Sequence, residues 1–179
     1  YDTSLISTYH GFCARLLRED SEKFEYPRDF RILDESGQKD ILNEIYESME
    51  LKLDHASFEK MLARIGAVKG GTTYIKGIIN PGVCRILPAV VSRDDEIVEK
   101  YLQKQKALFA LDFDDLINFA LYVLEKYDNI REKWQEKLNY IQVDEFQDSS
   151  CKEMELVDLL SGRHKNVMIV GDPDQNIYE

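Results

Sequence analysis

The sequence predicts an α/β fold with parallel strands, and three features of its C-terminal part support this prediction. A short apolar run with β-branched residues, at residues 140–143, leads into the acids Asp144, Glu145 and Asp148. A second apolar run, at residues 166–170, leads into a polar loop. Between them, residues 151–160 carry apolar side chains at helical spacing. Strand, helix and strand in this order form a right-handed β-α-β unit with two buried parallel strands.

The acids that follow the first strand indicate a binding site. Ligands of open α/β sheets bind outside the carboxyl ends of the strands, so both polar loops are expected at one cleft. A strand that ends in Asp-Glu, as at Asp144-Glu145, is the arrangement that holds Mg²⁺ beside a nucleotide phosphate in P-loop NTPases. The alternative is a solvated acidic turn, which is the better interpretation of these two residues taken alone.

Composition narrows the class of protein. The chain has 179 residues, enough for one domain with or without an insertion. It is 44% hydrophobic and 32% charged, which is typical of soluble globular proteins, and no apolar run approaches the ~18 residues of a membrane span. The net charge of -11 argues against strong nonspecific nucleic-acid binding. Scattered cysteines and histidines argue against a disulfide framework or zinc site and favour a cytoplasmic location.

The N-terminal half predicts mainly helices. Leu5-Ile6 reads as the end of a strand, and Ser7 or Thr8 as the cap of a helix. Residues 30–33 are expected to be extended. The rest of residues 21–107 is interpreted as a helical subdomain, whose helices are separated by glycines and prolines. Its cations are expected to be ordinary surface residues. The alternative is a weak basic face formed by Lys52, Lys60, Arg64, Lys69 and Lys76.

A buried helix is predicted from about residue 112 onward. Asp112 is its expected N-cap, and Asp115 stands at the third helical position. An apolar stripe follows, formed by Leu116, Ile117, Ala120, Leu121 and Leu124. The acids of this segment are therefore interpreted first as caps of the helix.

Two long motifs resemble those of one enzyme family. Residues 144–148 read Asp-Glu-Phe-Gln-Asp and residues 171–178 read Gly-Asp-Pro-Asp-Gln-Asn-Ile-Tyr, in the order and spacing of the second and third motifs of UvrD/Rep-type superfamily 1 DNA helicases. Residues 6–13 and 111–116 resemble two further motifs of the same family. The resemblance implies a partial RecA-like motor domain, formed by residues 1–20 and 108–179, with a helical subdomain inserted at residues 21–107.

The resemblance also implies roles in ATP hydrolysis. Asp144 would bind Mg²⁺ through water, Glu145 would polarise the attacking water, and Gln175 would sense the γ-phosphate of ATP. The other residues implied at the nucleotide site are Gln147, Asp148 and Asp172. These roles imply ATP as the substrate and Mg²⁺ as the cofactor.

A second set of residues would contact DNA. Thr8 and His10 would hydrogen-bond the backbone of single-stranded DNA, and Tyr178 would stack on a base for ~1–3 kcal/mol. Thr8 as a simple N-cap and Tyr178 as a core or rim aromatic are the alternatives. Single-stranded DNA and a duplex junction are the implied partners, with 3′-to-5′ movement and DNA repair as family traits.

The sequence departs from the family pattern in two places. Ser149-Ser150 follows Asp148 where the family has Thr-Asn. No G-x-x-x-x-G-K-[ST] phosphate-binding loop occurs in the chain, which starts without a methionine and stops directly after the third motif. We therefore expect an internal fragment that does not hydrolyse ATP by itself.

Two other functions remain open at this stage. One is a metal-dependent nuclease in which Asp144, Glu145 and Asp148 hold metal. The glycine-led loop after residue 170 argues against it, because a nuclease needs no γ-phosphate sensor. The other is a noncatalytic interaction module, which the acidic charge and the missing phosphate loop permit.

Overall fold

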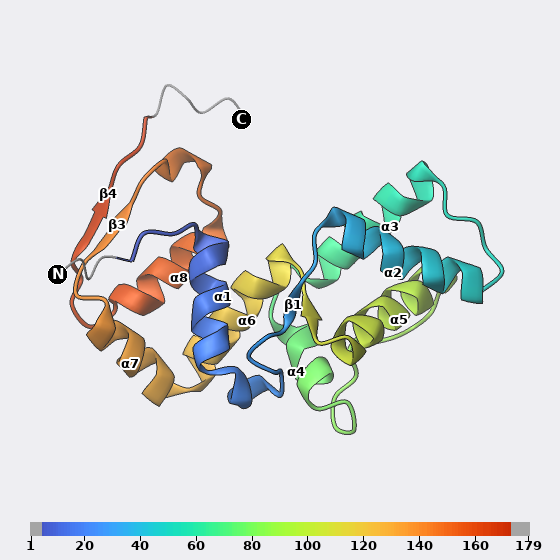
Figure 1. Cartoon of the computed structure of the whole chain (residues 1–179), viewed down its shortest axis with the longest axis horizontal. Helices are drawn as coiled ribbons and strands as arrows, with labels where there is room; N and C mark the ends of the chain where they lie inside the picture. The colour runs from blue at the N-terminus through green and yellow to red at the C-terminus, as the bar shows by residue number, and fades with distance from the viewer. Residues whose placement is uncertain (1–4, 173–179) are drawn as a thin grey trace. The chain divides into compact units, whose positions relative to one another are not determined.

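The computed structural model describes residues 5–172 and contains helices and short parallel strands (Figure 1). The chain divides into two compact units, residues 1–119 and 120–179, and the boundary falls within helix α6 (Phe113–Lys126). The predicted mixture of helices and parallel strands is thereby confirmed. No helix among residues 5–172 is long and apolar enough to cross a lipid bilayer.

The first unit is mainly helical, as the sequence predicts for residues 21–107. Its elements up to α6 are α1 (Tyr9–Glu19), η1 (Ser21–Phe24), β1 (Arg31–Ile32), α2 (Glu35–Ser48), α3 (His55–Val68), α4 (Thr73–Ile79), α5 (Arg93–Ala107) and β2 (Ala110–Leu111). The strand end expected at Leu5-Ile6 is wrong, because both residues lie in irregular chain and Ile6 is 92% exposed. Such an exposed, unpaired segment forms no ladder hydrogen bonds.

Polar side chains define where the helices of this unit begin. Thr8 Oγ1 accepts a hydrogen bond from Gly11 N–H at 3.1 Å, and Asp34 and Asp54 accept equivalent bonds at the starts of α2 and α3. Ser92 and Asp95 form a reciprocal capping box at the start of α5. Each such cap satisfies an otherwise unpaired N–H group and contributes ~1 kcal/mol.

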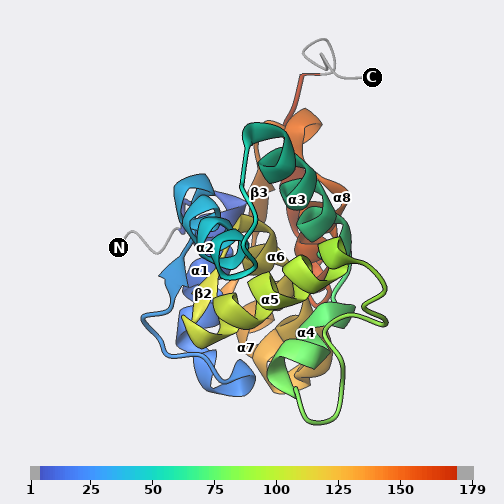
Figure 2. The same ribbon diagram turned by 90° about the vertical axis from the view of Figure 1, so that its right-hand side faces the viewer.

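The core of the first unit lies where α5 packs against α2 and α3 (Figure 2). Helical periodicity places their apolar side chains on the inner faces. The buried residues on these three helices include Ile41, Leu42, Ile45, Phe58, Met61, Ile65, Ile97, Val98, Tyr101 and Leu102. Between α4 and α5, the loop backbone comes so close to Gly77 that a Cβ there would lie 2.5 Å from Arg85 O.

A two-residue parallel pair fixes the chain just before α6. Arg31 pairs with Ala110 and Ile32 with Leu111, and Arg31 N–H donates to Phe109 O at 3.0 Å. Phe109 has a positive φ of 48°, which is a strained backbone for a bulky side chain. The predicted extended piece at residues 30–33 is confirmed, and its pairing holds Asp112 at the start of α6.

The second unit contains the predicted β-α-β segment. After the end of α6 its elements are α7 (Asp128–Lys137), β3 (Ile141–Val143), η2 (Phe146–Asp148), α8 (Cys151–Ser161) and β4 (Val167–Ile169). Strands β3 and β4 are parallel, with Val143 opposite Ile169, and α7 packs against α8. Gln135 on α7 donates to Leu159 O at 2.7 Å and fastens these two helices together.

The expected burial of both strands is wrong in part. Val143 is buried, but Met168 and Ile169 on β4 are 47% and 48% exposed. A parallel strand is buried only when other elements cover both faces of its sheet. Among residues 5–172 this sheet contains only the two strands β3 and β4, and the other described elements leave the side chains of β4 partly exposed.

Candidate functional site

The loops that follow β3 and β4 meet at one end of the two-stranded sheet. Beyond the strands, Val170 N–H donates to Val143 O at 2.8 Å, and Phe146 N–H donates to Val170 O at 3.0 Å. These bonds bring the acidic segment after Val143 against Gly171. Residues 144–148 and the start of the glycine-led loop therefore lie together, as the β-α-β order predicts.

Gln147 joins the two loops through its side-chain amide. Its Nε2 donates to Glu145 Oε2 at 2.6 Å, and its Oε1 accepts from Asp172 N–H at 3.1 Å. A glutamine amide has a donor and an acceptor, so it can satisfy both partners at once. The position of the Glu145 carboxylate thus depends on the loop after β4.

Glu145 has a left-handed backbone, with φ of 53° and ψ of 43°. Such a conformation is unfavourable for a residue with a Cβ and often occurs at functional sites. Asp144 Oδ1 accepts from Glu145 N–H at 3.0 Å, and Asp148 N–H donates to Glu145 O at 2.9 Å. These contacts stabilise a sharp turn on which Asp144 and Glu145 are both exposed.

Gly171 lies where the two loops approach each other closely. A Cβ at this position would lie 2.7 Å from Gln147 Oε1 and 3.2 Å from Phe146 N. The side-chain amide can move aside, whereas the backbone nitrogen is held by its bond to Val170 O. A larger residue would therefore push the loop away from Gln147.

The acids of this site are suited to a hydrated magnesium ion. Asp144, Glu145 and Asp148 are exposed carboxylates, and Mg²⁺ binds such hard oxygens while it keeps several waters. Within residues 5–172, no three His, Cys, Asp or Glu side chains are grouped so that they could hold one metal ion. Gln175 and Tyr178 lie outside the described residues.

The predicted DNA residues of the first unit lie at the start of α1. Thr8 caps the helix and is exposed, so its cap interpretation is confirmed and its DNA role stays a prediction. The partly exposed ring of His10 packs edge-on against Phe113, with ring centroids 5.2 Å apart. Phe113 is the first residue of α6 and is 52% exposed. We call Thr8, His10 and Phe113 the N-terminal corner.

Sequence reasoning missed Phe113. An apolar residue at a helix start is usually assigned to the core. The available signal was its position between the acids Asp112 and Asp114. An exposed aromatic ring beside a histidine offers a flat surface on which a nucleic-acid base can stack.

The possible basic face of the helical segment is not present as a set. Lys69 is fully buried, and Lys60 Nζ lies 2.7 Å from Asp94 Oδ2. Arg64 pairs with Asp95. Lys69 is paired with Asp112 and Asp115, so three of the five candidate cations have acidic partners, whereas Lys52 and Lys76 are exposed on the surface.

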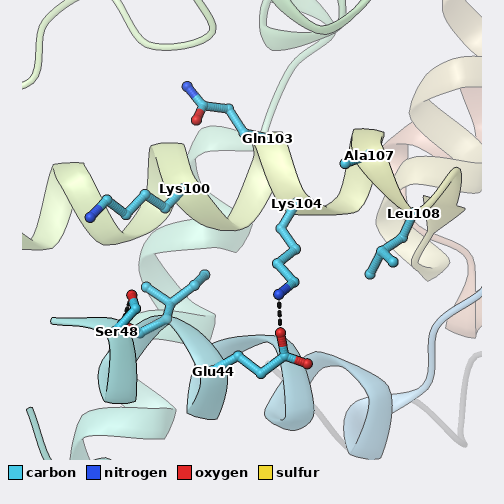
Figure 3. A pocket seen from close by; sticks show the side chains of 8 residues that line it. Glu44, Ser48, Lys100, Gln103, Lys104, Ala107 and Leu108 are labelled. Carbon is cyan, nitrogen blue, oxygen red and sulfur yellow. Dashed lines mark hydrogen bonds and ion pairs between the residues drawn. The ribbon is translucent and has the colours of Figure 1, made fainter. Parts of the chain in front are cut away.

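A groove between α2 and α5 is separate from the N-terminal corner. It is lined by Glu44, Ile45, Ser48, Lys100, Gln103, Lys104, Ala107 and Leu108 (Figure 3). Lys104 forms an ion pair with Glu44 across it. None of the predicted site residues lines this groove.

Comparison with known proteins defines the family. Residues 1–179 match the family described as UvrD/REP helicase N-terminal domain. The chain belongs to the UvrD/Rep helicase family. It is 32% identical over 176 residues to the ATP-dependent DNA helicase PcrA of Staphylococcus aureus and 33% identical to that of Staphylococcus epidermidis. These matches cover 97% of this UvrD/Rep-family chain and 23% of each relative, so the chain spans about a quarter of their length.

Proposed function

We propose that the full-length protein is an ATP-dependent DNA helicase that couples ATP hydrolysis to movement on single-stranded DNA and to duplex unwinding. Membership of the UvrD/Rep family and the names of the relatives support this function. The observation in this chain that carries it is the Gln147 link between Glu145 and Asp172 N–H. A 3′-to-5′ direction, action at a duplex junction, a cytoplasmic location and a role in DNA repair are proposed from the family resemblance alone.

In the proposed mechanism, Asp144 and Glu145 divide the chemistry between them. Asp144 would hold a hydrated Mg²⁺, which neutralises phosphate charge when bound. Glu145 would orient the attacking water and accept its proton, and Gln147 would keep the Glu145 carboxylate in place. Asp148, Asp172 and Gln175 are proposed to complete the nucleotide side of the site.

We also propose that DNA binds at the N-terminal corner. Thr8 and His10 would hydrogen-bond phosphate or sugar groups there, and Phe113 would stack on a base. From the family resemblance alone, Tyr178 is also proposed to stack on a base of single-stranded DNA. Residues 1–20 and 108–179 would belong to a RecA-like motor domain interrupted by residues 21–107. The exposed side chains of β4 support this proposal, since further strands and helices would cover them.

The chain by itself should not hydrolyse ATP, because it contains no phosphate-binding loop. Its affinity for single-stranded DNA should be ~10⁻⁴ M or weaker at physiological salt, because its net charge is -11. DNA-stimulated ATP turnover by the isolated chain would contradict the first expectation. Nanomolar binding would favour the noncatalytic module instead.

The test of the function uses Glu145→Gln in the full-length protein. This variant keeps the size of the side chain but cannot accept a proton, so DNA-stimulated kcat should fall ~10²–10⁴-fold. Affinities for ATP and single-stranded DNA should be retained. If ATP-independent, Mg²⁺-dependent DNA cleavage is found and is lost in this variant, the acids serve a nuclease rather than a helicase.

A further inference from the structure

A fully buried lysine lies beneath the start of α6. The Lys69 side chain is 0% exposed, and its Nζ lies 2.5 Å from Asp112 Oδ2 and 2.8 Å from Asp115 Oδ2. Gln105 Oε1 accepts a third hydrogen bond from Nζ at 3.0 Å. Lysine is almost never fully buried unless it is paired, and here its partners are Asp112, directly before α6, and Asp115 in the first turn of that helix.

Side chains from four helices complete this cluster. Tyr74 on α4 donates to Asp115 Oδ1 at 2.6 Å, and Gln105 on α5 donates to Asp115 Oδ2 at 3.0 Å. Gln38 on α2 donates to Asp112 Oδ2 at 3.0 Å. Asn118 on α6 donates to the Lys69 carbonyl oxygen at 2.8 Å. We call these residues and Lys69 the buried cluster, and it joins the helical segment to the start of α6.

The two acids also hold each other at the helix start. Asp115 N–H donates to Asp112 Oδ1 at 3.0 Å, and Asp112 N–H donates to Asp115 Oδ2 at 3.1 Å. Phe113 follows Asp112 directly and is exposed beside His10. Movement of the first turn of α6 would therefore move the Phe113 ring relative to His10.

A gain in stability is not a sufficient reason for burying these charges. The cluster contains one cation and two acids, and apolar side chains of similar volume are often as stabilising as a buried ion pair. What an ion pair of fixed geometry adds is one defined arrangement of the groups attached to it. Here the attached group is the N-terminal corner.

We infer that Lys69 is a positioning residue for single-stranded DNA binding, which fixes the first turn of α6 so that Phe113 stands beside His10. This inference rests on the proposed DNA contact at the N-terminal corner. It assigns a DNA-related task to a side chain that cannot reach DNA itself, and it makes the helical segment part of the binding apparatus.

A double-mutant cycle in the full-length protein tests the inference. The dissociation constant for a labelled single-stranded oligonucleotide is measured for the wild type, Lys69→Met, Phe113→Ala and the double variant. Loss of one stacking contact should weaken binding roughly 5- to 100-fold in Phe113→Ala. Lys69→Met should weaken it measurably but by no more than that, and the double variant should bind as Phe113→Ala does. Wild-type affinity in Lys69→Met would overturn the inference.

Other outcomes of the double-mutant cycle would contradict either the role of Lys69 or the proposed DNA contact. If the two losses multiply in the double variant, Lys69 does not act through Phe113 and the inference is overturned, while the DNA contact stands. If Phe113→Ala binds normally, the proposed contact at the N-terminal corner is itself wrong. The DNA concentration for half-maximal ATPase stimulation should rise in Lys69→Met, with kcat at saturating DNA retained.

Two further variants guard against simple unfolding. Lys76→Met removes an exposed lysine on α4 with the same change of side chain, and it should leave the Phe113-dependent affinity unchanged. If Lys69→Met does not fold, Gln38→Leu replaces it in the cycle. This change removes the hydrogen bond to Asp112 from a partly exposed residue and leaves the lysine paired. Additive losses for Gln38→Leu would overturn the inference equally.

Discussion

Gln147 Nε2 lies 2.6 Å from Glu145 Oε2, so the carboxylate proposed to activate water is held by a neighbouring amide. The other end of that amide accepts from Asp172 N–H, which makes Gln147 the joint between the two loops. The geometry of the acidic turn at residues 144–148 therefore depends on the position of the glycine-led loop.

Gln147→Leu should lower kcat of the full-length ATPase by roughly 10- to 100-fold, because residues that orient a reacting group typically contribute that much. Glu145 would remain present but lose its fixed position, and ATP affinity should change little. Steady-state kinetics with saturating DNA measure kcat, and an equilibrium titration with a nonhydrolysable ATP analogue measures the affinity. Gln103→Leu, an exposed glutamine on α5, is the matched control, and equal kinetics for the two variants would contradict the role of Gln147.

Two glycine substitutions should change stability in opposite directions. Gly66→Ala adds a Cβ with nothing within 4 Å inside α3, so it should raise the free energy of unfolding by ~0.5–1 kcal/mol. Gly77→Ala places a Cβ 2.5 Å from Arg85 O and Ile86 Cα, and the loop backbone must move. Denaturant unfolding of each variant should therefore show a gain for the first and a loss for the second. A gain for both would mean that the loop is not packed against α4.

The helices and the parallel β3–β4 pair could be predicted because their signals are local. Ile41 to Met49 and Leu156 to Leu160 show helical spacing within a few residues, and the caps lie next to the helices that they begin. The pairing of β1 with β2 could not be predicted from the sequence, because strands of two residues such as Arg31–Ile32 show no periodicity. The exposure of β4 was also unpredictable, because strand burial depends on other elements.

The sequence allowed prediction of residues in the acidic turn but not the supports beneath them. Asp144 to Asp148 form a contiguous motif, whereas the partners of Lys69 lie 43 and 46 residues further along the chain. A lysine at the end of a helix reads as a surface residue, and only tertiary contacts reveal its burial. The link from Gln147 to Asp172 likewise spans 25 residues.

The strained backbone at Phe109 should be measurable by comparing two small substitutions. Both Phe109→Asn and Phe109→Ala lose the ring contact with Tyr26, so their difference isolates the backbone. Asparagine tolerates a positive φ better than alanine does, and Phe109→Asn should be the more stable variant by roughly 0.5–1 kcal/mol. Thermal or denaturant unfolding gives the comparison. Equal stabilities would show that residue 109 relaxes to a negative φ when the ring is absent.

The buried cluster should give the protein a pH-dependent stability below neutrality. Burial raises the pKa of Asp115 from 3.8 to about 6, while the charge of Lys69 opposes this rise and that of Asp112 adds to it. Between pH 3.8 and about 6, Asp115 is therefore protonated in the folded protein and ionised in the unfolded chain. The stability contributed by this group is therefore present below 3.8 and is lost as the pH rises through about 6.

The neighbouring groups do not cancel this effect. The Asp112 carboxyl is also buried, but the charge of Lys69 outweighs that burial and lowers the pKa of Asp112. The contribution of Asp112 to the free energy of unfolding therefore changes only below pH 3.8. Burial alone would lower the pKa of Lys69, but Asp115 and Asp112 raise it above its ordinary value of 10.5. Burial raises the pKa of Tyr74 well above its ordinary value of 10.0. Asp115 is thus the member of the buried cluster that titrates between 3.8 and about 6.

Asp115→Asn should abolish this part of the pH dependence. The amide oxygen can accept the bonds that Oδ2 now receives, and its NH₂ can donate to the Tyr74 hydroxyl, which rotates to accept. Unfolding is followed in denaturant at pH values from about 4 to about 7, where the wild type should lose stability relative to the variant as pH rises. Asp114→Asn changes an exposed acid in the same helical turn and should keep the wild-type profile. Parallel pH profiles for the wild type and Asp115→Asn would mean that Asp115 is ionised throughout this range, and that Lys69 stabilises its charge more strongly than burial opposes it.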